Sequence, residues 1–333
     1  MPAAASEKTI IITGGNIGLG YHCAKAMATT KQWHVILACR HPNRAAQAVQ
    51  QLIAETTHQQ IEAMSLDLAS LASVRQFATD FATRNVPPLT ALVCNAGIQI
   101  VTGITYTEDG FETTFAVNHL GHFLLANLLL RHLIAPARIV FVSSATHNPA
   151  QRTGMPAPRY HGAKFLARPD IDPLAKADDK GTVGRRAYST SKLCNVFCTY
   201  ELSRRLQTEG KNSASHLIAV NAFDPGLMPG TGLARDYGAI ARFAWNFVLP
   251  VVSRLVPGIK SMRESGSALA RLVLDPTLEG VSGKYFAGLR EIPSSQESYD
   301  TGKAAELWET SAELVKLQPD ETILRCPPSA SAA

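Results

Sequence analysis

The sequence of 333 residues predicts a single α/β domain, in which a parallel sheet of about seven strands carries helices on both faces. Three observations lead to this fold class. Short apolar runs alternate with helical patterns from residue 8 onward, which is typical of a doubly wound parallel sheet. The first strand leads into a glycine-rich turn, and polar side chains follow several strands. We expect the domain to span 1–326, with a disordered tail at 327–333.

The glycine-rich turn lies between an apolar strand at 8–12 and a helix at 19–30. In that context, glycines let the backbone turn tightly and approach a pyrophosphate, which sits on the amino end of the helix. The spacing Gly-x-x-x-Gly-x-Gly therefore predicts a Rossmann-type dinucleotide site, against the alternative of a turn that only joins packed elements. Its candidate cofactor-binding residues are Gly14, Asn16, Ile17, Gly18, Leu19 and Gly20.

The second predicted strand, at 33–39, ends in a basic residue. Arg40 follows it directly, Arg44 lies nearby, and no Asp or Glu occurs between Ala38 and Gln47. An acidic residue here would bind the ribose hydroxyls of NAD, whereas an arginine accommodates a 2′-phosphate. The sequence therefore favours NADP(H), and a solvated basic strand end is the alternative.

Strands and helices continue to alternate after this point. The further elements that we expect are helix 43–55, strand 61–66, helix 71–84, strand 91–94, helix 111–133, strand 137–144, a helix that carries Tyr188 and ends near 210, strand 215–223, helix 264–274, strand 284–286 and helix 303–317. Two segments break the pattern. Residues 146–184 are rich in Pro, Gly, Arg and Asp and are expected to form an insertion near the mouth of the site. Residues 227–260 are apolar, with few charges, and are expected to form a lid over the substrate.

Polar residues gather at the carboxyl ends of the predicted strands. Thr13, Arg40, Asp67, Asn95 and Ser144 each follow a strand, and ligands of parallel sheets bind at that edge. We place Asp67 and Leu68 near the adenine. The small residues of Asn95-Ala96-Gly97 allow a loop to pass close to the cofactor, and Asn95 is suited to tying strand ends together.

Tyr188 and Lys192 lie four residues apart on one predicted helix. Residues at i and i+4 share a helix face, so a phenol and an ammonium group lie side by side. A free tyrosine has a pKa of about 10, and an adjacent cation lowers it by favouring the phenolate. The pair is thus a candidate general acid and base, although an ordinary exposed helix face has the same spacing.

Composition limits the partners and the setting. The net charge is +5, but the 32 basic residues are spread along the chain, which argues against a nucleic-acid partner. None of the six cysteines forms a Cys-x-x-Cys pair or a zinc-type cluster, so we expect no metal site and a reducing, cytoplasmic setting. We expect no signal peptide. The apolar stretch 240–256 leaves peripheral contact with a membrane as an alternative, and the oligomeric state stays open.

In combination and in order, these motifs resemble those of the short-chain dehydrogenase/reductase family over residues 8–286. The residues that carry the resemblance are Thr13-Gly14-x3-Gly18-x-Gly20, Asn95-Ala96-Gly97, Asn118, Ser144 and Tyr188-x3-Lys192. The resemblance implies a catalytic tetrad of Asn118, Ser144, Tyr188 and Lys192. By this analogy Tyr188 exchanges a proton with the substrate oxygen, Ser144 hydrogen-bonds that oxygen, and Asn118 holds a water. Lys192 would lower the Tyr188 pKa and bind the nicotinamide ribose, and the Pro225-Gly226 turn would flank the nicotinamide.

Two branches of that family share further features with the chain. Ala38-Cys39-Arg40, the run from Asn118 to Phe123 and the run from Ser143 to His147 resemble retinol-dehydrogenase-like members. Glu264-Ser265-Gly266 and Cys194 are similar to light-dependent protochlorophyllide reductase, although Cys194 is also read as a small buried residue. His119 and His122 are taken as packing residues of their helix.

The favoured hypothesis is an NADP(H)-dependent enzyme that transfers a hydride between nicotinamide and a lipophilic alcohol or carbonyl compound. The lipophilic substrate is inferred from the apolar side chains of the expected lid, such as Phe243, Trp245 and Phe247. A reductase that acts on a tetrapyrrole double bond is the first alternative. An NADP-binding sensor without catalysis is the second.

Overall fold

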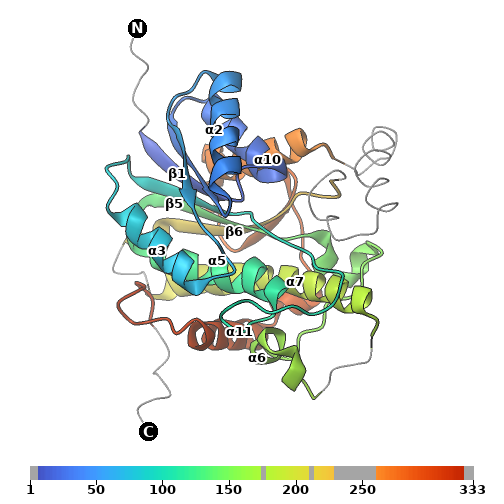
Figure 1. Cartoon of the computed structure of the whole chain (residues 1–333). Helices are drawn as coiled ribbons and strands as arrows, with labels where there is room; N and C mark the ends of the chain where they lie inside the picture. Colours follow the sequence, from blue (N-terminus) through green and yellow to red (C-terminus); the bar gives the residue numbers. More distant parts are fainter. Residues whose placement is uncertain (1–6, 174–177, 210–213, 229–259, 326–333) are drawn as a thin grey trace.

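A sheet of eight strands lies between two layers of helices (Figure 1). The computed structural model describes residues 7–173, 178–209, 214–228 and 260–325, so most of the expected lid and the whole expected tail lie outside the described residues. The strands are β1 Lys8–Thr13, β2 Trp33–Cys39, β3 Ile61–Ser65, β4 Leu89–Cys94, β5 Leu133–Val142, β6 Ile218–Asp224, β7 Lys284–Ala287 and β8 Arg290–Glu291. Their order is β3-β2-β1-β4-β5-β6-β7-β8, and every pair is parallel except β7 with β8.

Alternate residues of the central strand β1 pack into two separate hydrophobic cores, one on each face of the sheet. Ile11 packs with the layer formed by α3 Leu71–Ala82, α5 Gly121–Leu129, α7 Lys180–Glu209 and α11 Thr301–Leu314. Ile10 and Ile12 pack with the layer formed by α1 Gly18–Thr29, α2 Pro42–Thr56 and α10 Met262–Leu274. Because both faces of the sheet are covered, the central strands are largely apolar, and polar ligands are left the strand ends. The predicted α/β domain is confirmed.

The direction of strand growth reverses between β1 and β4. The chain first adds β2 and β3 on one side of β1, then returns to add β4 and the later strands on the other side. In sheets of this kind the crevice for a ligand opens at the carboxyl edge, at such a reversal. The glycine-rich turn follows β1 directly, so it lies at this crevice.

The predicted helix 111–133 is wrong in its detail. The chain forms a short helix α4 at Thr113–Phe115, a π-helical segment at Ala116–Leu120, α5, and a 3₁₀ turn at Leu130–His132, and β5 already begins at Leu133. A continuous apolar run does not distinguish a buried helix from a buried strand, which explains the misplaced boundary. Within 146–184, the described residues form 3₁₀ turns and helix α6 Ala163–Ala167, and α7 starts at Lys180.

Helix α11 covers the outer side of α7, and the two lie side by side in Figure 1. Arg205 of α7 joins them. It forms ion pairs with Glu201 on its own helix, at 2.6 Å, and with Glu309 on α11. Its guanidinium carbon also lies 5.0 Å from the centre of the Trp308 ring, a cation–π distance. Among the helices of the described ranges, none is long and apolar enough to cross a membrane.

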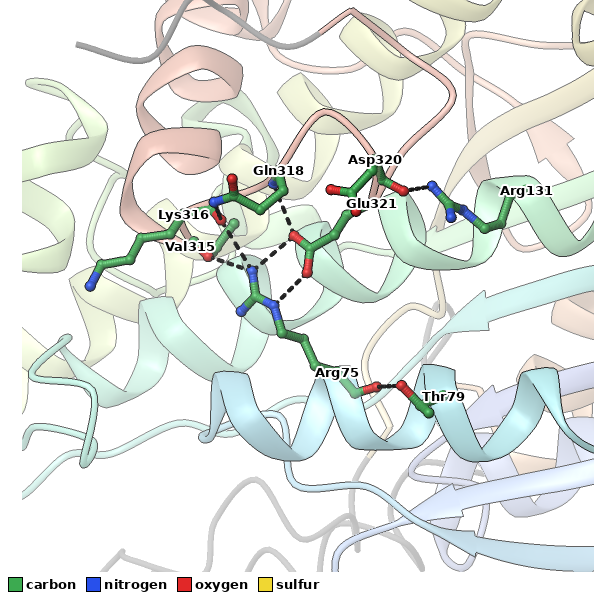
Figure 2. A network of polar contacts seen from close by, with 8 residues as sticks. All are labelled: Arg75, Thr79, Arg131, Val315, Lys316, Gln318, Asp320 and Glu321. Atoms are coloured by element: carbon green, nitrogen blue, oxygen red, sulfur yellow. Dashed lines mark hydrogen bonds and ion pairs between the residues drawn. The ribbon is translucent and has the colours of Figure 1, made fainter. Parts of the chain in front are cut away.

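The segment after α11 is fastened to α3 by Arg75, as Figure 2 shows. The Arg75 guanidinium binds both carboxylate oxygens of Glu321, at 2.6 and 3.0 Å, and donates to the carbonyls of Val315 and Lys316. Arg131 adds a hydrogen bond to the carbonyl of Asp320. The Arg75 side chain therefore binds two carbonyl groups at the carboxyl end of α11 and holds the residues that follow this helix.

Replacing Arg75 by Ala should lower the free energy of unfolding by about 1–3 kcal/mol, because a two-pronged ion pair and two carbonyl bonds are lost. Urea unfolding followed by circular dichroism measures the change. Arg84→Ala is the matched control, since Arg84 makes a single exposed contact with Glu62; its expected cost is about 0–1 kcal/mol. Equal costs for the two variants would show that the C-terminal segment adds nothing.

Candidate active site

The hydroxyl of Thr13 is the junction at the carboxyl edge of the sheet. It accepts hydrogen bonds from the backbone N–H groups of Asn95 and Ala96, both at 2.9 Å. The amide of Asn95 returns a bond of 2.7 Å to the Thr13 carbonyl. The end of β1 and the end of β4 are thus tied together where the glycine turn begins.

His122 completes this junction from α5. Its Nδ1 lies 3.2 Å from the Asn118 carbonyl, so this nitrogen carries the proton, and its Nε2 accepts from the Thr13 hydroxyl at 2.8 Å. Burial lowers the pKa of His122 to about 4, so the ring is neutral at pH 7. The sequence indicated only packing for this residue. The sequence holds one indication of this contact, which is that His122 lies four residues after Asn118 on the same helix face.

The glycine turn fits a pyrophosphate group. Gly14 and Gly18 have φ angles of +62° and +59°, which favour glycine. A Cβ on Gly20 would lie 2.6 Å from both the Asn95 amide and the Gly14 carbonyl, so only glycine allows this close approach. Ile17 provides no side-chain cap for α1, which leaves the first N–H groups of that helix without a side-chain partner. Such amides are suited to binding an anion.

Arg40 and Asp67 lie at the ends of β2 and β3, away from the Tyr188 end of the edge. Arg40 is exposed, and its guanidinium reaches the ring of its neighbour His41 at 3.3 Å. The Asp67 carboxylate accepts from the N–H of Ala69 at 3.0 Å and shapes the turn that buries Leu68. An exposed arginine on the β2 end is suited to a phosphate group outside the crevice.

Asn118 lies in the π-helical segment and joins two other elements. Its side chain accepts from the N–H of Ile98 at 2.8 Å and donates to the Ile98 carbonyl and the Ser191 hydroxyl, both at 2.9 Å. Ser191 in turn donates to the Tyr188 carbonyl at 2.7 Å. The loop after β4 is therefore fixed against the Tyr188 region of α7. Single π turns occur often at functional sites.

Lys192 is buried beside Tyr188. Its Nζ lies 5.5 Å from the centre of the Tyr188 ring and donates to the Val142 carbonyl at 3.0 Å. Burial lowers the pKa of Lys192 to about 8, although the Asp224 carboxylate acts in the opposite direction. A Cβ on Gly97 would lie 3.3 Å from Lys192 Nζ and 3.4 Å from Asn118 Oδ1. The structure therefore brings Asn118 and Lys192 together at the bare backbone of Gly97, with the Tyr188 ring beside Lys192.

Ser144 and Pro225 approach the same edge from β5 and β6. Ser144 directly follows Ser143, whose hydroxyl donates to the Lys192 carbonyl at 2.8 Å. The Ser144 hydroxyl accepts from the Thr146 N–H at 3.3 Å and caps a 3₁₀ turn at Ala145–His147. In the second turn, the Pro225 carbonyl accepts from the Ser265 hydroxyl at 2.7 Å, and Gly226 has a φ of +78°.

Cys194 lies outside this group. It is fully buried in the core between α7 and its covering layer, where burial raises the pKa of its thiol well above the usual range. This placement agrees with its interpretation as a small buried residue.

A doubly wound parallel sheet with a glycine turn at its reversal, and a Tyr-x-x-x-Lys helix beside it, defines a dinucleotide-binding α/β protein. Residues 8–167 match the family model described as short chain dehydrogenase. The WW domain-containing oxidoreductase of Danio rerio is 37% identical over 313 residues, which cover 93% of this chain and 69% of that protein. The chain belongs to the short-chain dehydrogenase/reductase family, as its motifs predict.

The chain is also similar to a curated reductase and to a solved structure. The chloroplastic protochlorophyllide reductase of Daucus carota is 36% identical over 324 residues, which cover 93% of this chain and 78% of that protein. A Shigella flexneri protein described as a short chain dehydrogenase, solved in complex with NADP, superposes with a TM-score of 0.60 at 18% identity, covering 87% of this chain and 100% of that one. At this identity the structural likeness shows the fold alone.

Replacing Lys192 by Met should raise the stability of the protein while it removes activity. A buried ammonium group with a pKa near 8 destabilises the fold at pH 7, by up to about 3 kcal/mol relative to a neutral side chain. The Val142 carbonyl keeps a partner, because the Asn195 amide also donates to it at 3.0 Å. Chemical unfolding at pH 7 measures the change.

The control is Lys25→Met, which removes a half-exposed lysine paired with Glu55 and should change stability by about 0.5 kcal/mol or less. Because the folded pKa of Lys192 lies below its unfolded value, its unfavourable contribution is complete below pH 8 and disappears as the pH rises toward 10.5. The gain from Lys192→Met should shrink over the same range. A variant less stable than wild type at pH 7 would contradict this account.

Proposed function

We propose that the protein is an NADP(H)-dependent oxidoreductase that interconverts lipophilic alcohols and carbonyl compounds, with Tyr188 as the general acid and base. The observation that carries the proposal is the approach of Lys192 and Asn118 to the bare backbone of Gly97, with the Tyr188 ring 5.5 Å from the Lys192 ammonium group. A proton donor and a buried cation therefore lie side by side near the loop that follows β4. Membership of an oxidoreductase family supports this reading.

Different residues at the carboxyl edge of the sheet would bind different parts of the cofactor. When bound, NADPH would supply a hydride to the substrate carbon. The free amides of α1 would hold its pyrophosphate, and Arg40 would pair with its 2′-phosphate. Lys192 would bind the nicotinamide ribose, and the Pro225-Gly226 turn would limit the ring on its far side. A family neighbour solved with NADP supports this choice of cofactor.

The chemistry at the substrate oxygen is assigned to two hydroxyl groups. In reduction, Tyr188 donates its proton to the oxygen as negative charge develops there, and Ser144 donates a hydrogen bond to the same atom. The Lys192 cation stabilises the phenolate that remains. In oxidation the same groups act in reverse. Ser191 and Asn118 hold the backbone of Tyr188 and the adjoining loop in place.

Reduction of a tetrapyrrole double bond is the second candidate function, because relatives of 36% identity are named protochlorophyllide reductase. Cys194 is fully buried in the core, and we assign it no part in either reaction. A screen of NADPH oxidation with aldehydes, ketones and protochlorophyllide, in the dark and in the light, separates the two functions. An NADP-binding sensor would bind NADPH and oxidise it with none of them.

Replacing Tyr188 by Phe should lower kcat by at least the ~10²-fold that general acid and base catalysis contributes, since the ring stays and only the proton is lost. The dissociation constant of NADPH, measured by fluorescence titration, should change little. The assay uses the best substrate of the screen. Turnover near the wild-type rate would exclude Tyr188 as the acid and base.

Replacing Arg40 by Asp should weaken NADPH and spare NADH. The charge-assisted bonds lost with the 2′-phosphate are worth roughly 1.5–3 kcal/mol, which is about ten- to a hundredfold in affinity. Titration of both cofactors measures the effect. Arg290→Asp changes the same charge on the distant strand β8 and should alter neither affinity. Unchanged NADPH affinity in the Arg40 variant would rule out this phosphate site.

A further inference from the structure

His147 is buried directly behind Ser144 and has both ring nitrogens engaged. Its side chain is 1% exposed. The Nδ1 atom lies 2.7 Å from the Ser144 carbonyl, and the Nε2 atom lies 3.0 Å from the backbone N–H of Ser295. A carbonyl only accepts and an N–H only donates, so Nδ1 carries the proton and Nε2 is bare. These two partners select one neutral tautomer of the ring.

The ring joins three parts of the chain at the substrate end of the edge. It belongs to the 3₁₀ turn after β5, its centre lies 4.8 Å from that of the tilted Tyr285 ring in β7, and it receives the N–H of Ser295 from the segment that leads to α11. Ser144 is extended, with φ −167° and ψ 151°, and its carbonyl is the group that the imidazole holds. The orientation of this peptide unit sets the backbone from which the Ser144 side chain projects, and the hydroxyl itself accepts from the Thr146 N–H at 3.3 Å.

We infer that His147 is the positioning residue of Ser144, and that its neutral imidazole holds the serine backbone so that the hydroxyl faces the substrate oxygen. This inference rests on the proposed function. The ring does not touch the substrate or the cofactor. It acts by linking the β5 end to the Ser295 segment, so that Ser144 cannot rotate away when the oxygen becomes charged.

The same geometry makes the positioning sensitive to acid. Protonation of Nε2 would place an N–H against the N–H of Ser295, and the bond would be lost. Burial lowers the pKa of His147 below its usual 6.5, with the Ser144 carbonyl and then the Asp224 carboxylate acting in the opposite direction. The Asp224 carboxylate acts on the ring through its charge, and the Tyr285 phenol lies against it. The bond therefore holds above pH 6.5 and fails as the pH falls through the lowered value.

The test compares His147→Gln with His147→Leu. A glutamine amide donates through its nitrogen and accepts through its oxygen, so it replaces both bonds and does not titrate in this range. His58→Leu is the matched control. His58 is also buried, and its ring makes a hydrogen bond of 2.7 Å to the Trp33 carbonyl at the start of β2, the opposite edge of the sheet.

We expect His147→Leu to lower kcat by about 10- to 100-fold with an unchanged KM for NADPH. We expect the kcat of the wild type to decline in acid, and we expect His147→Gln to restore kcat to within about threefold and to lack this decline. His58→Leu should lower the melting temperature and leave kcat unchanged. Ring-nitrogen NMR of wild type should show the Nδ1–H tautomer of His147 near neutral pH.

Equal kcat for His147→Leu and His58→Leu, a glutamine variant as slow as the leucine variant, or an Nε2–H tautomer would each overturn the inference. If His147→Leu fails to fold, the inference is tested by the pH dependence of kcat in His147→Gln and by the tautomer of His147 in the wild type. Tyr188→Phe is assayed in parallel. If Tyr188→Phe loses turnover but the His147 variants do not, only the positioning role is rejected. If Tyr188→Phe keeps its turnover, the proposed function itself is rejected.

Discussion

The structure depends on a constraint at the carboxyl edge of the sheet, where buried polar groups must find partners inside the protein. The Thr13 hydroxyl meets this constraint for two strands at once, because it accepts two backbone N–H groups and donates to His122. A hydroxyl is suited to this position because it combines acceptor and donor capacity in one small group. His122 must stay neutral to accept the third bond, and its burial ensures that it does. The shape of the nucleotide crevice follows from this small network.

Helix α7 shows a second compromise, between stability and chemistry. It carries Lys192 into a site that lowers the pKa of an ammonium group, so the burial of this cation costs stability, and perturbed groups of this kind cluster at functional sites. On its outer side the same helix carries Arg205, whose charge is matched by Glu201 and Glu309 and covered by Trp308. The paired charge of Arg205 fixes the helix. Lys192, which has no carboxylate at contact distance among the described residues, lies toward the site.

The sequence predicted much of the architecture, because strand runs and breaker residues are local signals. The bounds of β2 are those that the apolar run indicated, and the glycine turn lies where its spacing placed it. The boundary at Leu133 was wrong, since burial makes helix and strand equally apolar there. Strand β8 was missed because two exposed residues carry no pattern.

The polar connections of the site were harder to predict than its motifs. The roles of His122 and His147 depend on the direction of a ring within the folded core, and a single histidine in a sequence does not reveal its partners. Asn118 could be named from the motif, but its bonds to Ile98 and Ser191 join residues far apart in the chain. Tertiary contacts decide these features. The substrate specificity assigned to 227–260 stays a prediction, because most of that segment lies outside the described residues.

The cover that α11 provides has a consequence for how the chain is made. Residues 304–324 contribute several side chains to the core that contains Phe123 and Leu202, and the Trp308 ring packs edge-on against Phe123 at 4.8 Å. A ribosome makes these residues after the other described members of that core. Until then the part of the core that α11 covers is exposed, and apolar surfaces of this kind make a folding chain prone to aggregation. A premature stop codon that removes 304–324 should therefore expose this part of the core and promote aggregation, although it shortens the chain by little.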